Sequence, residues 1–214
     1  MSQLPLPMAW TRRGGPESLL IHTANADAVA LVRDWQRWPS LCTLLVGPVR
    51  SGRTLIGQAF IAESGGLLVD DADRANEEHL FNIWNESRDT GRPLLLIAQE
   101  APPTWQIALP DLRTRLATAA IARIAPPDEA VSAALIAHGL ELAGSAFAPD
   151  VAEFLARRTQ RCYEAIDAVI TELNALSLAS TQKLSVSMIR HSLRNIVDLD
   201  RPAAPANEPR EGLD

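Results

Sequence analysis

The sequence predicts an α/β protein in which a parallel β-sheet base domain is followed by an α-helical lid subdomain. Three observations lead to this fold class. Short, continuously apolar runs alternate with helical patterns between residues 25 and 124, as in parallel sheets covered on both faces. A glycine-bearing turn joins the first of these runs to a helix. Beyond Pro126 and Pro127, only helical patterns follow.

Each element of the base has its own signal. In the first helix, Ala28, Leu31, Val32 and Trp35 share one face, and Pro39 ends it. The elements expected in the base are helices over 25–38, 54–63 and 76–90 and strands over 41–46, 67–69, 94–97 and 121–124. The lid is expected to contain helices over 128–144, 150–156, 162–176 and 185–196.

These signals divide the chain into four parts. The base is expected over 16–126 and the lid over 127–198. Residues 1–15 are rich in proline and predict an extended tail. Residues 199–214 are rich in proline and charge, and this composition predicts disorder.

Composition excludes several functional classes. The chain has 214 residues, of which 47% are hydrophobic, which is enough for a sizeable core. The net charge of −6 disfavours strong, direct DNA binding over a broad surface. Cys42 and Cys162 lack the spacing of a zinc site or a disulfide framework. No apolar run is long enough for a membrane helix, and a cytoplasmic location is expected.

The turn after the first strand matches a phosphate-binding loop. Residues 47–54 fit the pattern GxxxxG[K/R][ST], with Arg53 where lysine is usual. In such loops backbone N–H groups cradle phosphates, the basic side chain reaches the terminal phosphates, and the hydroxyl (here of Thr54) holds Mg²⁺. The alternative is an ordinary glycine turn between strand and helix. The candidate nucleotide-binding residues here are Gly47, Pro48, Val49, Arg50, Ser51, Gly52, Arg53, Thr54 and Leu55.

Two acids end the next strand and support nucleotide binding. Asp70 and Asp71 follow the apolar run 67–69. Asp70 would share the Mg²⁺ shell with Thr54, and Asp71 could orient water. An ordinary acidic strand end is the alternative. Because guanidinium does not replace an ammonium group geometrically, Arg53 favours nucleotide binding over hydrolysis. Arg50 replaces a glycine often seen at this loop position, so the loop conformation is expected to differ.

Several further segments resemble the DnaA-type AAA+ initiators, and in particular their short regulatory homologues. The order and spacing of these segments over about 16–197 carry the resemblance. The segments are 20–25 (LIHTAN), 96–103 (LIAQEAPP), 112–116 (LRTRL) and 124–129 (IAPPDE). The resemblance implies that Leu20, Ile21 and Asn25 lie beside the nucleotide base, and that Glu100 is an acidic sensor. It places Tyr163 at the position of a lid sensor, with Arg161 close by.

Arg115 matches the arginine finger of these initiators. A finger inserted into a neighbour's site stabilises charge on the phosphoryl group being transferred. The alternative is that Arg113 and Arg115 are a solvated pair at a helix end, the commoner fate of surface arginines.

The N-terminal peptide resembles the short clamp-binding peptides of bacterial replication proteins. Gln3 would bind a polar pocket, and Leu4, Leu6 and Met8 would fill an apolar groove. A proline-stiffened segment loses little entropy on docking. A proline-rich leader without a partner is the alternative.

The resemblance implies a regulator of replication initiation. Such a protein binds ADP or ATP, with Mg²⁺, docks on the sliding clamp (the DNA polymerase III beta subunit), and stimulates ATP hydrolysis on DnaA through Arg115. It is expected to lack the initiators' DNA-reading helix-turn-helix and to have little or no ATPase activity of its own; a homodimer is one assembly open to it. Two alternatives stay open: a self-sufficient AAA+ ATPase that loads or remodels other proteins, and a DnaA paralogue that recruits replication proteins.

Overall fold

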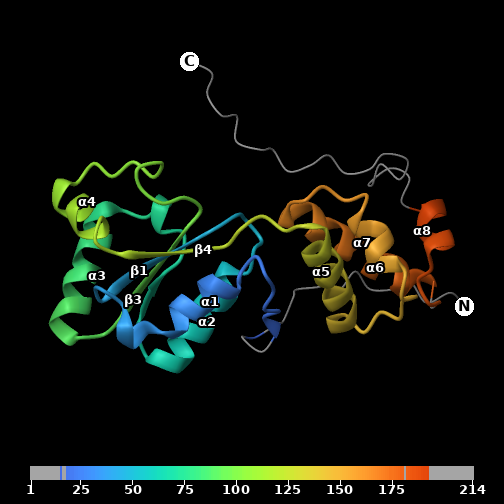
Figure 1. Cartoon of the computed structure of the whole chain (residues 1–214), viewed down its shortest axis with the longest axis horizontal. Coiled ribbons are helices and arrows are strands. Elements are labelled where there is room, and N and C mark those ends of the chain that lie inside the picture. The colour runs from blue at the N-terminus through green and yellow to red at the C-terminus, as the bar shows by residue number, and fades with distance from the viewer. Residues whose placement is uncertain (1–14, 16–17, 181, 193–214) are drawn as a thin grey trace, which may run out of the picture.

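A computed structural model of the chain describes residues 15, 18–180 and 182–192. It consists of a sheet-containing base and a helical lid, joined by the segment that follows β4 (Figure 1). The base contains α1 (Ala26–Arg33), β1 (Cys42–Val46), α2 (Arg53–Ser64), β2 (Leu67–Val69), α3 (Glu77–Thr90), β3 (Leu94–Ala98), α4 (Pro110–Leu116) and β4 (Ala120–Arg123), with short 3₁₀ turns η2 (Trp35–Arg37) and η3 (Ala72–Arg74). The lid contains α5 (Glu129–Leu142), α6 (Val151–Ala156), α7 (Tyr163–Ser180) and α8 (Val186–Ser192). This arrangement confirms the α/β base followed by a helical lid.

The four strands form one parallel sheet in the order β2-β3-β1-β4. All carboxyl ends therefore lie at one edge, and the turns after β1, β2 and β3 meet there. This edge faces the lid (Figure 1). The central strands β1 and β3 are fully buried. The strand β2 lies at the edge of the sheet, and its residues are only half-buried.

Two elements differ from the sequence prediction. The first helix ends at Arg33 rather than at 38, because the chain turns into η2 and the Trp38 indole Nε1–H donates to the Leu31 carbonyl at 2.8 Å. Helix α4 was not expected. It begins with Pro110, and the Glu77 carboxylate accepts the N–H groups of Ala108 and Leu109 just before it. Glu77 thereby ties the start of α4 to α3.

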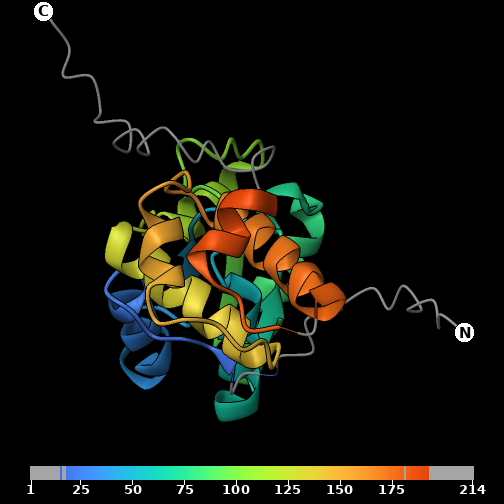
Figure 2. The same ribbon diagram turned by 90° about the vertical axis from the view of Figure 1, so that its right-hand side faces the viewer.

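The lid packs α5, α6 and α7 around its own apolar core, which includes Ile136, Leu155 and Leu173. Figure 2 views this end of the molecule. The contacts between lid and base include two hydrogen-bond contacts. The Tyr163 hydroxyl donates to the Ala125 carbonyl at 2.9 Å, and the His138 ring Nε2 lies 2.9 Å from the Ser18 carbonyl oxygen. Across the residues that the structure describes, no helix is both long and apolar enough to span a bilayer.

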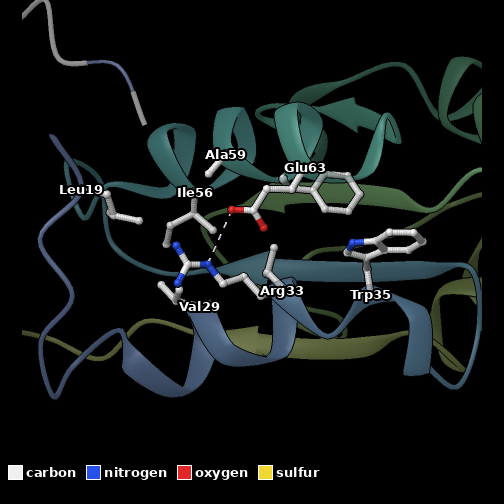
Figure 3. Close-up of a pocket in the computed structure, with 9 residues that line it drawn as sticks. Leu19, Val29, Arg33, Trp35, Ile56, Ala59 and Glu63 are labelled. Atoms are coloured by element: carbon white, nitrogen blue, oxygen red, sulfur yellow. Dashed lines mark ion pairs between the residues drawn. The ribbon is translucent and has the colours of Figure 1, made fainter. Parts of the chain in front are cut away.

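A hollow lies between α1 and α2 and is shown in Figure 3. Its lining is apolar apart from Arg33 and Glu63, whose Nε and Oε1 atoms are 3.8 Å apart and pair across its mouth. Leu19, Val29 and Ile56 supply much of the rest.

Candidate functional site

The turn between β1 and α2 contains two glycines that its backbone requires. A Cβ added to Gly47 would lie 2.8 Å from the Ile124 Cβ, so only glycine fits there. Gly52 has a φ of +89°, which glycine adopts readily. The loop then delivers the chain into the N-terminus of the 12-residue helix α2, where backbone N–H groups and the helix dipole favour an anion.

Arg50 occupies the left-handed region with a φ of 64°. This conformation costs a non-glycine residue about 1–2 kcal/mol. Arg50 therefore adopts a backbone conformation that glycine would adopt at lower cost. Its exposed guanidinium reaches across to the lid, where Nε lies 3.6 Å from Oδ2 of Asp167 in α7.

Arg53 is the most informative side chain of the loop. Only 8% of the residue is exposed. Its Nη1 atom is buried and makes no hydrogen bond, and no carboxylate in the described part of the chain lies within ion-pair distance. The Ser51 hydroxyl, two residues earlier in the loop, is also buried without a partner. A buried charge is costly unless it is paired, so this pair of donors fits an anionic ligand.

Thr54 and Asp70 are brought together although 16 residues separate them. The Thr54 hydroxyl donates to Oδ2 of Asp70 at 2.7 Å, and both residues are exposed to solvent. A hydroxyl and a carboxylate are the hard oxygen ligands that Mg²⁺ accepts next to nucleotide phosphates, so these residues fit the ion. Asp71 lies beside them in the left-handed region, exposed, with its N–H bonded to Oδ1 of Asp70.

The segment expected beside the base is shaped by Asn25. This residue is buried, its Oδ1 accepts the His22 backbone N–H at 2.8 Å, and its Nδ2 donates to the Leu20 carbonyl at 3.0 Å. The Asn25 amide therefore folds the segment rather than pointing at solvent. Ile21 is 46% exposed and Leu20 is half-buried.

His22 and Tyr163 meet between base and lid. Their rings stack with centroids 6.4 Å apart. Burial lowers the pKa of His22, although the nearby Asp128 opposes this effect. Burial, with a further contribution from Asp128, raises the pKa of Tyr163 to about 12. With its hydroxyl bonded to Ala125, Tyr163 connects lid to base as a neutral group and carries no charge for a phosphate.

Other predicted residues lie elsewhere. The Arg161 Nη2 atom is 3.6 Å from Oε2 of Glu129, so Arg161 is paired within the lid. Glu100 is exposed, two residues after β3. Pro48 and Leu55 are half-buried, and Val49 is exposed. Gln3, Leu4, Leu6 and Met8 lie outside the described residues.

Arg115 lies at the opposite edge of the sheet. It is near the end of α4, shortly before β4 begins, and therefore sits at the amino edge of the parallel sheet, whereas Thr54 and Asp70 sit at the carboxyl edge. In Figure 1, α3 and α4 are at the end of the base away from the lid. Arg113 is exposed, but Arg115 is half-buried against α3. Arg115 and Arg113 are therefore not an equivalent solvated pair.

Sequence reasoning missed two sets of residues. Asp167 of the lid approaches the loop and pairs with Arg50. Phe81, Trp84 and Asn85 of α3 contact Arg115. The spacing of these three residues puts them on one helical face, but the sequence does not indicate which element that face meets.

Comparison with known proteins places the fold. No family model matches the sequence. Domain III of the replication initiation protein DnaA from Thermotoga maritima is similar, with a TM-score of 0.71 and 15% identity over 85% of this chain and 96% of that chain. AMPPCP-bound DnaA from Aquifex aeolicus gives 0.63 and 15% over 84% and 68%. The Holliday junction branch migration motor RuvB from Thermotoga maritima gives 0.58 and 14% over 80% and 66%. The fold therefore resembles that of DnaA domain III and RuvB.

Proposed function

Proceeding from the AAA+-like fold, we propose that this protein is a nucleotide-binding regulator of DNA replication initiation, of the Hda kind. It binds ADP or ATP at the loop 47–54, docks on the sliding clamp, and stimulates ATP hydrolysis on DnaA by supplying Arg115. The observation that carries nucleotide binding is Arg53, a buried arginine without an acidic partner at the start of α2. Phosphate oxygens would complete its hydrogen bonds.

The Thr54–Asp70 pair supports a Mg²⁺-nucleotide at the same place. It lies at the carboxyl edge of the sheet together with the loop, where open α/β sheets bind their ligands. The similar DnaA of Aquifex aeolicus has been solved with AMPPCP bound, which is consistent with a nucleotide here. When bound, Mg²⁺ would neutralise phosphate charge beside Thr54 and Asp70.

The position of Arg115 supports action on a second protein. The four-residue strand β4 alone spans about 13 Å, and it separates the end of α4 from the carboxyl edge that carries the loop. An arginine at this place cannot reach the phosphates bound by its own chain without unfolding the base. It can reach an ATP held at the surface of a partner, where it would stabilise the developing charge.

The partners rest on the sequence. The peptide containing Gln3, Leu4, Leu6 and Met8 resembles clamp-binding peptides, and the net charge of −6 favours protein partners over direct DNA contact. Docking on a clamp already loaded on DNA would bring the protein near DnaA without a DNA-binding surface of its own.

The deciding experiment measures ATP hydrolysis by DnaA in the presence of DNA-loaded clamp and this protein. Wild type should stimulate hydrolysis, and Arg115→Ala should abolish stimulation while clamp binding and thermal unfolding stay unchanged. Arg113→Ala is the matched control, since Arg113 lies on the same helix but is exposed. Equal stimulation by Arg115→Ala would remove this function. Robust ATP turnover by the protein alone, without DnaA, would favour a self-sufficient ATPase instead.

A further inference from the structure

Three side chains of α3 enclose the Arg115 guanidinium. Its central carbon lies 4.1 Å from the centroid of the Phe81 ring and 4.2 Å from that of the Trp84 ring. Its Nη1 atom donates to Oδ1 of Asn85 at 2.9 Å. We refer to Phe81, Trp84 and Asn85 as the Arg115 cradle.

The cradle is rigidly built. Its three residues stand at positions i, i+3 and i+4 of one helix and therefore share a face. The helix starts with a side-chain cap, in which Oδ1 of Asn76 accepts the His79 N–H. The next residue, Glu77, binds the two N–H groups ahead of α4. The helix carrying the cradle and the helix carrying Arg115 are thus fixed to each other.

One edge of the guanidinium is left open. Nε and Nη2 of Arg115 make no hydrogen bond to the described part of the chain. Neither atom is among the buried polar atoms that lack a partner, so solvent reaches both. These two atoms offer parallel N–H groups, the geometry that binds a phosphate or carboxylate at two points.

The approach to this edge is accessible. Trp84 also borders a surface hollow with Leu41, Ser87 and Arg88, and Leu41 is 42% exposed. A partner surface can therefore come close to the cradle without displacing the core.

We propose that Phe81, Trp84 and Asn85 are positioning residues that hold Arg115 with its Nε and Nη2 edge toward an oxyanion supplied by the partner. This inference rests on the proposed function, in which that oxyanion is the terminal phosphate of ATP bound to DnaA. A free arginine side chain loses much rotamer entropy when it is fixed, and the cradle removes that freedom before the partner arrives. This arrangement stabilises the transition state of hydrolysis, because hydrogen-bond donors that are already in place need no reorganisation.

The test compares cradle variants by the rate of ATP hydrolysis on DnaA in the presence of DNA-loaded clamp. Titrating each variant of this protein gives both the maximal stimulated rate and the concentration that produces half of it. Asn85→Ala removes the hydrogen bond. The double variant Phe81→Leu, Trp84→Leu removes both ring faces but keeps apolar bulk. Each should lower the maximal stimulated rate between about tenfold and a hundredfold, with unchanged half-saturating concentration. The single variant Trp84→Phe should retain most of the wild-type rate, because it keeps an aromatic face against the guanidinium.

His79→Ala, an exposed position on the same helix, is the control and should behave as wild type. Thermal unfolding of every variant separates misfolding from mispositioning, and Asn85→Ala tests the idea if the double variant does not fold. Wild-type rates for Asn85→Ala and the double variant, with Arg115→Ala inactive, would overturn the cradle but leave the proposed function standing. A rate above wild type would also overturn it, since the cradle would then restrain Arg115. Full stimulation by Arg115→Ala would instead defeat the proposed function itself.

Discussion

The hydroxyl of Thr54 lies 2.7 Å from Oδ2 of Asp70. Thr54 follows the turn after β1, and Asp70 follows β2, so the contact joins the segments after these two strands. Neither strand pairs with the other, because β3 lies between β2 and β1. The contact exists because parallel strands bring their carboxyl ends to one edge. It predicts where a divalent cation would sit and supplies the first experiment.

Removing either oxygen should remove the magnesium dependence of nucleotide binding. Wild type should bind ADP more tightly with Mg²⁺ than with a chelator present. Thr54→Ala and Asp70→Asn should show the same affinity in both conditions, since one ligand of the ion is lost. Calorimetric titration measures this difference. Asp71→Asn serves as a comparison, and an undiminished Mg²⁺ effect in Asp70→Asn would show that the ion binds elsewhere.

Neutralising Asp167 should strengthen nucleotide binding. Its carboxylate pairs with Arg50 of the loop and places a negative charge near the incoming phosphates. Asp167→Asn should release Arg50 and raise ADP affinity, by roughly threefold to tenfold for one charge at partly screened distance. Fluorescence competition with a labelled nucleotide measures the change. Glu164→Gln makes the same charge change at an exposed position of α7 and should have no effect; weaker binding by Asp167→Asn would count against this arrangement.

Stability should fall as the solution becomes acidic, because of His22. The pKa of His22 is lowered in the folded protein. In the unfolded chain, His22 therefore takes up a proton near its ordinary pKa of about 6.5, whereas in the folded chain it takes up that proton only at lower pH. The stabilisation is therefore present above about pH 6.5 and is lost as the pH falls below it. Urea unfolding from pH 7.5 to 5.0 measures this loss. His22→Gln should flatten the slope in that range, whereas His79→Gln, at an exposed position, should leave it unchanged.

The proposed clamp-binding role of the N-terminal peptide can be tested by direct binding. Gln3→Ala combined with Leu6→Ala should abolish capture by immobilised sliding clamp, because the polar anchor and an apolar anchor are both lost. ADP affinity should stay at the wild-type value. Failure of wild type to bind the clamp would remove this partner from the proposed function.

The layout of the fold could be predicted from the sequence because its signals are local. Each signal can be recognised within a few neighbouring residues: the apolar runs at β1 and β3, the glycines at 47 and 52, and the acids after β2. The partners of charged side chains could not be predicted in the same way. Asp167 meets Arg50 from over a hundred residues away, and α4 lacks a strong pattern because it has only seven residues. These features depend on how helices and the lid pack.

The surroundings of Arg115 show the same division between what the sequence predicts and what only the fold reveals. The motif 112–116 resembles a finger segment, and that resemblance could be recognised in the sequence. The aromatic residues that contact its guanidinium come from α3, some thirty residues earlier, and only the packing of α3 on α4 brings them together.

Titration of the purified protein with ADP, comparing wild type with Arg53→Ala, Arg53→Lys and the exposed-site control Arg37→Ala, tests the central claim most directly. Wild type and Arg37→Ala should bind saturably. Arg53→Ala should lose at least about tenfold in affinity, because charge-assisted hydrogen bonds to phosphate are lost, and Arg53→Lys should keep most of it. Absence of saturable binding by wild type, or equal affinity in Arg53→Ala, would contradict the account.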